Sequence, residues 1–346
     1  MILDNVKIGN SCSPYIIAEI SGNHGGSIDK VFKLIDSAKE SGASAVKIQS
    51  YEPNTMTIDS KKEHFKVKEG LWKGYKLYDL YNIAHTPFAW HEDIFKYAKQ
   101  KKITLFSTPF DETAVDLLES LDCPFYKIAS FENHDLELIK KVARTKKPMI
   151  ISTGIASFET ITESVATAIN NGCKDLCLLH CISGYPTPIE EFNLKTLIDL
   201  KKQFKVEIGL SDHSLGNVAA LTAVALGAVV IEKHFKLKKD DEVVDGEFSM
   251  DPTGLSNLVK DANKTWASLG QVSYELKESE IQNSRFKRSI FFVNNIKKDD
   301  IITKNDIKRL RPGTGIEPKH YSKIIGRRVN KNVEVGDPVQ WDDIYE

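Results

Sequence analysis

Short apolar runs alternate along the chain with longer amphipathic stretches. Eight of these runs are rich in β-branched and other apolar residues and end in polar ones. They occupy residues 15–20, 45–50, 103–108, 125–130, 149–154, 175–181, 206–212 and 228–234. Because their bodies lack the apolar–polar alternation of half-exposed strands, they predict a parallel sheet that is buried on both faces.

The stretches between the runs carry helix signals. Ser27, Asp135 and Ser157 stand where N-cap residues are expected, and a further helix is predicted from Thr253 to Leu269. Strand and helix alternate eight times, which favours a closed (β/α)8 barrel, the TIM barrel. An open doubly wound sheet is the main alternative, but no GxGxxG fingerprint follows a strand to support it.

Two segments break this rhythm. Residues 51–89 form a connection whose length is typical of a lid or substrate loop, and an extra helix pair is the structural alternative; we expect elements of both. Residues 271–286 are polar and predict a linker. Residues 287–346 contain short strands and turns, which indicate a small domain with a thin core. The expected organisation is therefore a barrel over residues 1–270, the linker, and a mostly-β C-terminal domain.

Composition narrows the class of protein. The chain has 47 Lys and Arg against 48 Asp and Glu, so it offers no field that would steer it onto nucleic acid or an anionic membrane. No apolar run approaches the roughly 20 residues of a membrane span. The N-terminus lacks the features of a signal peptide, so a cytoplasmic location is expected. Five cysteines are an odd number in a long chain, so a disulfide framework is not expected. Cys173, Cys177 and Cys181 are expected to be buried structural thiols.

Polar residues gather at the carboxyl ends of the predicted strands, where βα loops build the active sites of such barrels. The set includes Glu19, Lys47, Gln49, Thr108, Lys127, Ser130, Ser152, His180, Ser211, His213 and His234. Lys47 and Lys127, with hydroxyl groups nearby, suit a dianionic ligand, and structural ion pairs are the alternative. Glu19 is a candidate general acid or base, a sugar contact, or simply the partner of Lys47.

Two of these residues suggest a metal site. His213 and His234 end consecutive strands, so their rings can approach one ion and leave positions open for water and substrate. With oxygen atoms as the remaining ligands, Mn²⁺ or Mg²⁺ fits better than a thiolate-rich zinc site. Hydrogen-bonded core histidines are the alternative, and His180 is a weaker candidate for a third polar contact.

The barrel segments resemble the sialic acid synthase family, whose members condense phosphoenolpyruvate with an N-acetylated amino sugar. The matching segments are IAEISGNHGG (17–26), AVKIQSY (45–51), STPFDETAVDLL (107–118), YKIASFE (126–132), ISTGIAS (151–157), LLHCISGYPTP (178–188), IGLSDHSLG (208–216) and VIEKHF (230–235). The segment IKRLRPGTGI (307–316) resembles that family's antifreeze-like (SAF-type) domain. The resemblance therefore covers nearly all of the chain.

The resemblance implies roles for individual residues. Glu19, His213 and His234 would be catalytic, and the two histidines would hold a divalent metal, Mn²⁺ or else Mg²⁺ or Co²⁺. Arg311 would reach into the neighbouring subunit's site in a domain-swapped homodimer. The substrate-binding residues would be Lys47, Gln49, Thr108, Lys127, Ser130, Glu132, Ser152, Ser183, Tyr185, Ser211, Asp245 and Arg311, with Lys47, Lys127, Ser130, Ser152 and Ser211 on phosphoenolpyruvate and Asp245 on the sugar.

Within this family the chain is most similar to the pseudaminic acid synthase branch, which uses a 2,4-diacetamido-2,4,6-trideoxy-altrose. The similarity lies in SGNHGG, in the aromatic-rich LWKGYKLYDLYNIAHTPFAWH, and in Ser183, where N-acetylneuraminate synthases usually carry asparagine. An N-acetylneuraminate or legionaminate synthase is the alternative inside the family. A Schiff-base aldolase with Lys127 or Lys47 as nucleophile, and a catalytically silent binding protein, are alternatives of other classes.

Overall fold

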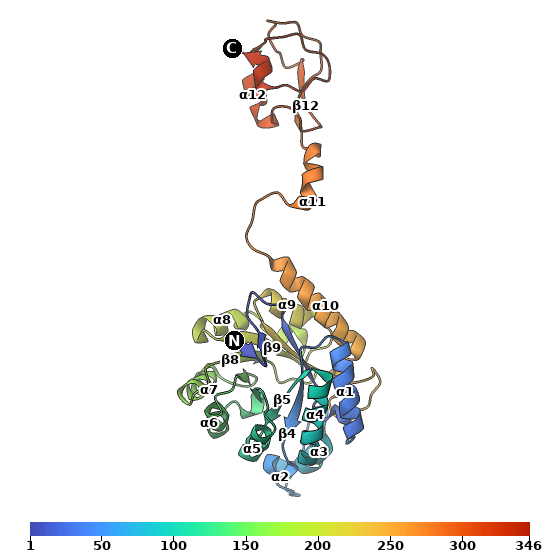
Figure 1. The fold of residues 1–346 in the computed structure, drawn as a ribbon, viewed down its shortest axis with the longest axis vertical. Coiled ribbons are helices and arrows are strands. Elements are labelled where there is room, and N and C mark those ends of the chain that lie inside the picture. Colours follow the sequence, from blue (N-terminus) through green and yellow to red (C-terminus); the bar gives the residue numbers. More distant parts are fainter. The chain divides into compact units, whose positions relative to one another are not determined.

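The computed structural model describes residues 1–346. The chain divides into two compact units, Met1–Gly270 and Gln271–Glu346 (Figure 1). None of its helices combines the length and the apolar character needed to cross a membrane.

Eight parallel strands of the first unit close into a barrel (Figure 1). The strands are β3 (Tyr15–Glu19), β4 (Ala45–Ser50), β5 (Thr104–Pro109), β6 (Tyr126–Ile128), β7 (Met149–Ser152), β8 (Leu176–Cys181), β9 (Glu207–Asp212) and β10 (Val230–His234). They follow one another around the barrel in chain order, and β10 pairs with β3 to close it. The predicted (β/α)8 fold is confirmed, and no strand end differs from its predicted position by more than two residues.

Eight helices follow the strands and surround the barrel (Figure 1). They are α1 (Ile28–Glu40), α4 (His91–Lys101), α5 (Glu112–Ser120), α6 (Leu136–Arg144), α7 (Phe158–Asn170), α8 (Thr196–Phe204), α9 (Val218–Ala225) and α10 (Pro252–Leu269). Ser27, Asp135 and Ser157 cap α1, α6 and α7 as predicted. Helix α10 begins one residue before the predicted Thr253, because Asp251 caps it and Pro252 suits the first helical position.

The long connection after β4 contains both helices and loop, as expected. Helices α2 (Pro53–Met56) and α3 (Leu77–Ala84) flank a loop in which Lys66 and Lys76 bridge antiparallel. Two short 3-10 turns, Glu63–Phe65 and Phe88–Trp90, complete the connection. Before the barrel, β1 (Ile2–Leu3) and β2 (Val6–Lys7) form a small hairpin.

The second unit has a small core of its own. Strand β11 (Ser289–Phe292) pairs antiparallel with β12 (Ile307–Leu310), and β13 (Arg328–Val329) pairs with β14 (Ile344–Tyr345). A single-turn helix, α12 (Tyr321–Ile324), packs with Ile290 and Phe292 in the same cluster. The stretch 271–286, predicted as a linker, contains another short helix, α11 (Glu278–Ile281), and a 3-10 turn, Gln282–Phe286.

Candidate active site

The polar residues at the carboxyl ends of the strands fall into two sets, because side chains along a strand alternate between its two faces. On β10, Glu232 and His234 line a pocket inside the barrel. Lys233 lies between them on the other face, where its Nζ is 2.8 Å from Asp212 Oδ2. The inward set forms the candidate site, and the outward set lies between the barrel and its surrounding helices.

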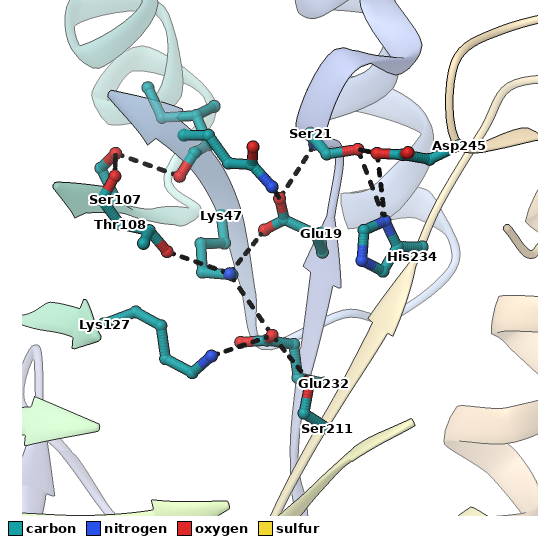
Figure 2. Close-up of polar contacts among 12 residues, drawn as sticks. Glu19, Ser21, Lys47, Ser107, Thr108, Lys127, Ser211, Glu232, His234 and Asp245 are labelled. Carbon is teal, nitrogen blue, oxygen red and sulfur yellow. Dashed lines mark hydrogen bonds and ion pairs between the residues drawn. The ribbon is translucent and has the colours of Figure 1, made fainter. Parts of the chain in front are cut away.

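Two lysines and two glutamates form a buried ion-pair network at the floor of this pocket (Figure 2). Lys47 Nζ lies 3.0 Å from Glu19 Oε2 and 3.3 Å from Glu232 Oε1. Lys127 Nζ lies 3.3 Å from the same Glu232 oxygen. Each of the four side chains is at most 4% exposed. The predicted convergence of the two lysines is present, and so are the ion pairs considered as its alternative.

Hydroxyl groups complete the floor. Lys47 Nζ donates to Thr108 Oγ1 at 3.1 Å, and Ser211 Oγ donates to Glu232 Oε1 at 3.1 Å. Thr108 therefore holds the ammonium group of Lys47, and Ser211 holds the carboxylate of Glu232. Neither hydroxyl lines the pocket, so their predicted contacts with substrate stay predictions.

The two glutamates of the floor titrate differently. Burial raises the pKa of Glu19, and the neighbouring Lys47 opposes this only in part. Burial acts on Glu232 in the same direction, but Lys127 and Lys47 together outweigh it and lower the pKa of Glu232 to about 2. In many active sites, two neighbouring carboxyl groups have pKa values that are pushed apart in this way, so that one stays ionised while the other can hold a proton.

Glu19 lies beneath the pocket surface. Its Oε1 accepts hydrogen bonds from Gln49 Nε2 at 3.0 Å and from the backbone N–H of Ser21 at 3.1 Å. Gln49 and Lys47 line the pocket, whereas Glu19 does not. Glu19 therefore positions the two residues above it, and its predicted direct role in catalysis stays a prediction.

Ser130 and Ser183 meet at Gly154, beside the floor, and Ser152 lies two residues before this glycine. The backbone N–H of Gly154 donates to Ser130 Oγ at 3.2 Å. The hydroxyls of Ser152 and Ser183 are buried and have no hydrogen-bond partner in the protein. A Cβ at position 154 would collide with Ser183 Oγ and lie 2.6 Å from Ser130 Oγ, so a larger residue would displace these two hydroxyls. Buried hydroxyls without partners indicate a place where a polar ligand completes the hydrogen bonding.

His213 and His234 lie together, as predicted, with ring centroids 5.3 Å apart. His213 Nδ1 donates to the carbonyl of Ile182 at 3.1 Å. Burial lowers the pKa of His213, but the neighbouring Cys181 outweighs it, so the pKa of this ring is raised. Burial and the nearby His213 lower the pKa of His234, so this ring is neutral. His234 Nδ1 lies 3.7 Å from Asp245 Oδ2, and Ser21 donates a short hydrogen bond to that carboxylate (Figure 2).

This donor set fits an open metal site. No group of three or more His, Cys, Asp or Glu side chains is arranged to enclose an ion. The imidazoles of His213 and His234 beside Asp245 instead suit an ion that keeps positions for water or substrate oxygen atoms. The metal itself stays a prediction.

Two residues lie near the histidines in sequence or in space. Cys181 is a buried thiol, as predicted, and its Sγ lies 3.8 Å from His213 Nδ1. His180 points to the other face of β8, where Nε2 contacts the carbonyl of Phe192 at 2.6 Å, so it does not line the pocket. Cys173 and Cys177 are buried, as predicted; Cys123 is buried too, whereas Cys12 is partly exposed.

The pocket encloses about 350 Å³, and its walls are more varied than its floor. Tyr185 and Asp245 line it as predicted, and Tyr185 packs against His213 with ring centroids 4.5 Å apart. Glu132 also lines the pocket, and its Oε2 is buried without a hydrogen-bond partner. Burial raises the pKa of Glu132 to about 7, against the opposing charge of Lys127.

Some functional positions were not predicted. Glu232 joins both lysines, yet sequence reasoning gave it no role beside His234, two residues later on the same face. Ser21 and Phe248 were also missed, because their contacts with the histidines depend on loops rather than strands. Arg311 is an exposed residue of the second unit, so its predicted place in a neighbouring subunit's site stays a prediction.

Family models match both units of the chain. The model described as the NeuB family matches residues 34–274, and the model described as the SAF domain matches residues 287–344. The C-terminal domain predicted as antifreeze-like is thereby confirmed.

Curated relatives match over nearly the full length. Pseudaminic acid synthase from Campylobacter jejuni strain 81-176 is 43% identical, over 95% of this chain and 96% of its own. Pseudaminic acid synthase from Helicobacter pylori is 40% identical, over 96% and 98%. N,N'-diacetyllegionaminic acid synthase from Campylobacter jejuni is 36% identical, over 92% and 96%.

Solved structures show the same fold. The N-acetylneuraminic acid synthetase from Leptospira borgpetersenii, crystallised with citrate, aligns with a TM-score of 0.73 at 30% identity, over 82% of this chain and 94% of that one. The spore coat polysaccharide biosynthesis protein SpsE from Bacillus subtilis aligns with a TM-score of 0.68 at 32% identity, over 100% and 99%.

Proposed function

The chain belongs to the NeuB family, and we propose that it is a pseudaminic acid synthase. It condenses phosphoenolpyruvate with 2,4-diacetamido-2,4,6-trideoxy-altrose to give a nine-carbon 2-keto sugar acid and phosphate. The observation that carries this proposal is the floor of the pocket, where two buried lysines converge beside serine hydroxyls without partners. Such a floor suits the phosphate and carboxylate of phosphoenolpyruvate.

The floor binds and orients phosphoenolpyruvate. Lys47 and Lys127 supply positive charge, while Ser130, Ser152 and the nearby Ser183 donate hydrogen bonds to anionic oxygen atoms. Because these groups are held in place before the ligand arrives, they need no reorganisation as charge shifts during the reaction. Glu232 sets the spacing of the two ammonium groups by accepting from both.

His213 and His234 would hold the divalent ion, with Asp245 beside them. When bound, Mn²⁺, Mg²⁺ or Co²⁺ would supply Lewis-acid polarisation of the sugar aldehyde. The residues themselves orient the sugar: Asp245 faces the pocket next to His234, and Tyr185 packs over His213.

The proposed reaction needs a group that gives and accepts protons in the pocket. C3 of phosphoenolpyruvate forms a bond to the sugar's aldehyde carbon, the aldehyde oxygen takes a proton, water adds at C2, and phosphate leaves with cleavage of the C–O bond. Glu132 is the candidate for this work, because it lines the pocket and burial raises its pKa to about 7, so it can give a proton to the aldehyde oxygen and later accept one from the attacking water.

The family relationship extends to assembly and location, as proposals. We propose a homodimer in which the second unit of one chain serves the other chain's site through Arg311, since a core as small as that of the second unit gains stability by docking. We also propose that the enzyme works in the cytoplasm, where its phosphoenolpyruvate is made and where buried thiols stay reduced.

Phosphate release tests the proposed function. Phosphoenolpyruvate is offered with the 2,4-diacetamido trideoxy altrose, its manno-type counterpart or N-acetylmannosamine. We expect turnover with the altrose, loss of activity in EDTA, and recovery on adding Mn²⁺. Turnover only with N-acetylmannosamine would overturn the assignment. Metal-independent trapping of pyruvate by borohydride would instead favour the Schiff-base aldolase.

A further inference from the structure

One wall of the pocket has a chemistry that the ion pairs and histidines do not explain. It comes from the connection between β4 and β5, and no charged side chain of that connection lines the pocket. We call this the apolar wall, and its members are Met56, Val67, Trp72, Leu77 and Leu80; Tyr51 and Tyr81 of the same connection also line the pocket. Lys47, Lys127 and Glu232, which come from the barrel strands, line the same pocket.

A hairpin loop carries the tryptophan of this wall. The backbone N–H of Val67 donates to the carbonyl of Tyr75 at 2.9 Å, and the N–H of Gly74 donates back to Val67 at 2.9 Å. Gly70 and Gly74 have φ angles of +80° and +97°, which favour glycine in the tight tip around Trp72. The loop is therefore built to hold Trp72 in one position.

Trp72 connects this loop to the segment after β10. Its Nε1–H donates to the carbonyl of Val244 at 2.9 Å, directly before Asp245. Its ring centroid lies 5.6 Å from that of Tyr185, which packs in turn on His213. The apolar wall is thus fixed to the same groups that orient the sugar, and it does not stand free in solvent.

The proposed reaction decides which part of the sugar meets this wall. C1 of the sugar must reach the floor, because Lys47 and Lys127 hold the phosphoenolpyruvate that attacks it. C6 is the opposite end of the six-carbon chain, so it lies away from the floor. There the apolar wall offers van der Waals contact and no charged or carboxylate partner for a hydroxyl.

We propose that the apolar wall, with Trp72 at its centre, is a specificity subsite that accepts the C6 methyl group of a 6-deoxy sugar and disfavours a C6 hydroxyl. The proposal rests on the proposed function and explains how the site selects its sugar. A hydroxyl that loses water and finds no partner is costly to bury, whereas a methyl group gains from burial. Apolar pockets discriminate against such small changes by about 10- to 200-fold.

The test compares two sugars that differ only at C6: the 2,4-diacetamido trideoxy altrose and its 6-hydroxy counterpart. The readout is the ratio of their kcat/KM values. We expect Trp72→Ala to lower this ratio by about tenfold or more, chiefly by impairing the deoxy sugar, with KM for phosphoenolpyruvate unchanged. Trp72→Phe removes the N–H donor but keeps an apolar ring, so it should retain most of the ratio.

Tyr75→Ala is the matched control. Tyr75 lies on the same hairpin and is 45% exposed, but it does not line the pocket, so the ratio should not change. An unchanged ratio in Trp72→Ala, or an equal fall in Tyr75→Ala, would overturn the proposed subsite. If the wild-type protein releases phosphate with neither sugar, the proposed function fails first; a wild type that turns over the altrose separates the two failures.

Discussion

At the scale of single residues, Glu232 is the centre of the site. One of its oxygen atoms accepts from two buried ammonium groups and from Ser211. Removing its charge would leave Lys47 and Lys127 facing each other with fewer counter-charges in a dry environment. Breaking a buried ion pair by removing one partner is far more costly than losing an exposed one.

We therefore expect Glu232→Gln to destabilise the free protein by about 3–5 kcal/mol. A dianionic ligand restores counter-charge, so phosphoenolpyruvate should raise the melting temperature of this variant more than that of the wild type. Thermal unfolding with and without phosphoenolpyruvate measures both effects. Glu137→Gln, at a side chain 76% exposed, is the control and should change neither. Equal ligand shifts in Glu232→Gln and wild type would contradict the expectation.

Glu132 gives the site a pH dependence. Its raised pKa of about 7 means that the proton needed by the new hydroxyl is present below that pH and is lost as the pH rises through it. We expect kcat/KM to fall on the alkaline side with an apparent pKa near this value. Glu132→Gln should lower the rate by about 10²–10⁴-fold and remove that limb of the profile. A full alkaline limb in Glu132→Gln would assign it to another group.

Only some of the site residues could be predicted from the sequence. The lysines and histidines were found because unusual side chains ended apolar strands. Glu232 was recognised only as a polar strand end and was given no role, although it stands two residues before His234 and therefore shares its face. His180 was considered for the pocket, although its neighbour Cys181 is the residue that faces inward. In both cases the alternation of side chains between the two faces of a strand would have identified the residue that faces inward.

At the scale of elements, the ends of β9 and β10 are held together on both faces. Inside the barrel, His234 ends β10 and His213 directly follows β9. Outside, Lys233 pairs with Asp212, and its Nζ also donates to the carbonyl of Ser214 at 2.5 Å. Asp212 in turn accepts from the backbone N–H and the hydroxyl of Ser214. These contacts fix the turn that follows β9 and, with it, the position of the first histidine.

Lys233→Met tests how much this outer pair contributes. Asp212 would stay buried without its counter-ion, and we expect a loss of about 3–5 kcal/mol in the free energy of unfolding. Asp212→Asn combined with Lys233→Met should recover part of that loss, because no uncompensated charge remains. Denaturant titration measures the cycle. Lys264→Met breaks an exposed pair, Lys264–Asp261, and should cost less than about 0.5 kcal/mol. A similar cost for both lysine variants would contradict the argument.

The elements themselves were largely predictable, for a local reason. Continuous apolar runs mark strands buried on both faces, and caps such as Ser27 act within one helical turn. The contact between Trp72 and Val244 joins residues 172 positions apart, so no local sequence pattern can predict it. The long connection was recognised as unusual by its length, but its hairpin and its anchor became visible only in the structure.

At the scale of the whole molecule, the chain consists of two units with separate cores. Only the first contains the pocket. Arg311, from a segment that resembles the family's antifreeze-like domain, belongs to the second. If subunits share a site, an inactive variant with a change in the barrel should restore activity to an inactive variant with a change in the second unit. Stability measurements would not reveal such complementation.

We expect Arg311→Ala and Lys127→Ala each to lose most activity alone. Refolded together at equal amounts, half of the dimers would be mixed and half of the sites in those would be intact, which gives roughly a quarter of wild-type activity. Phosphate release measures the recovery, and size-exclusion chromatography with distinguishable tags identifies the mixed dimers. Purified mixed dimers without activity would count against the exchange of domains.

The hydrogen bond from Ser21 to Asp245 has a consequence for how the protein matures. It joins residues 224 positions apart, across the seam where the last strand meets the first. Until that seam forms, His234 and the segment after it have no fixed position relative to Glu19 and Ser21. A nascent or partly folded chain therefore has no site to bind sugar, and a bound sugar favours the closed seam by mass action. Sugar binding therefore reports the fraction of chains in which β10 has paired with β3 and the barrel is closed.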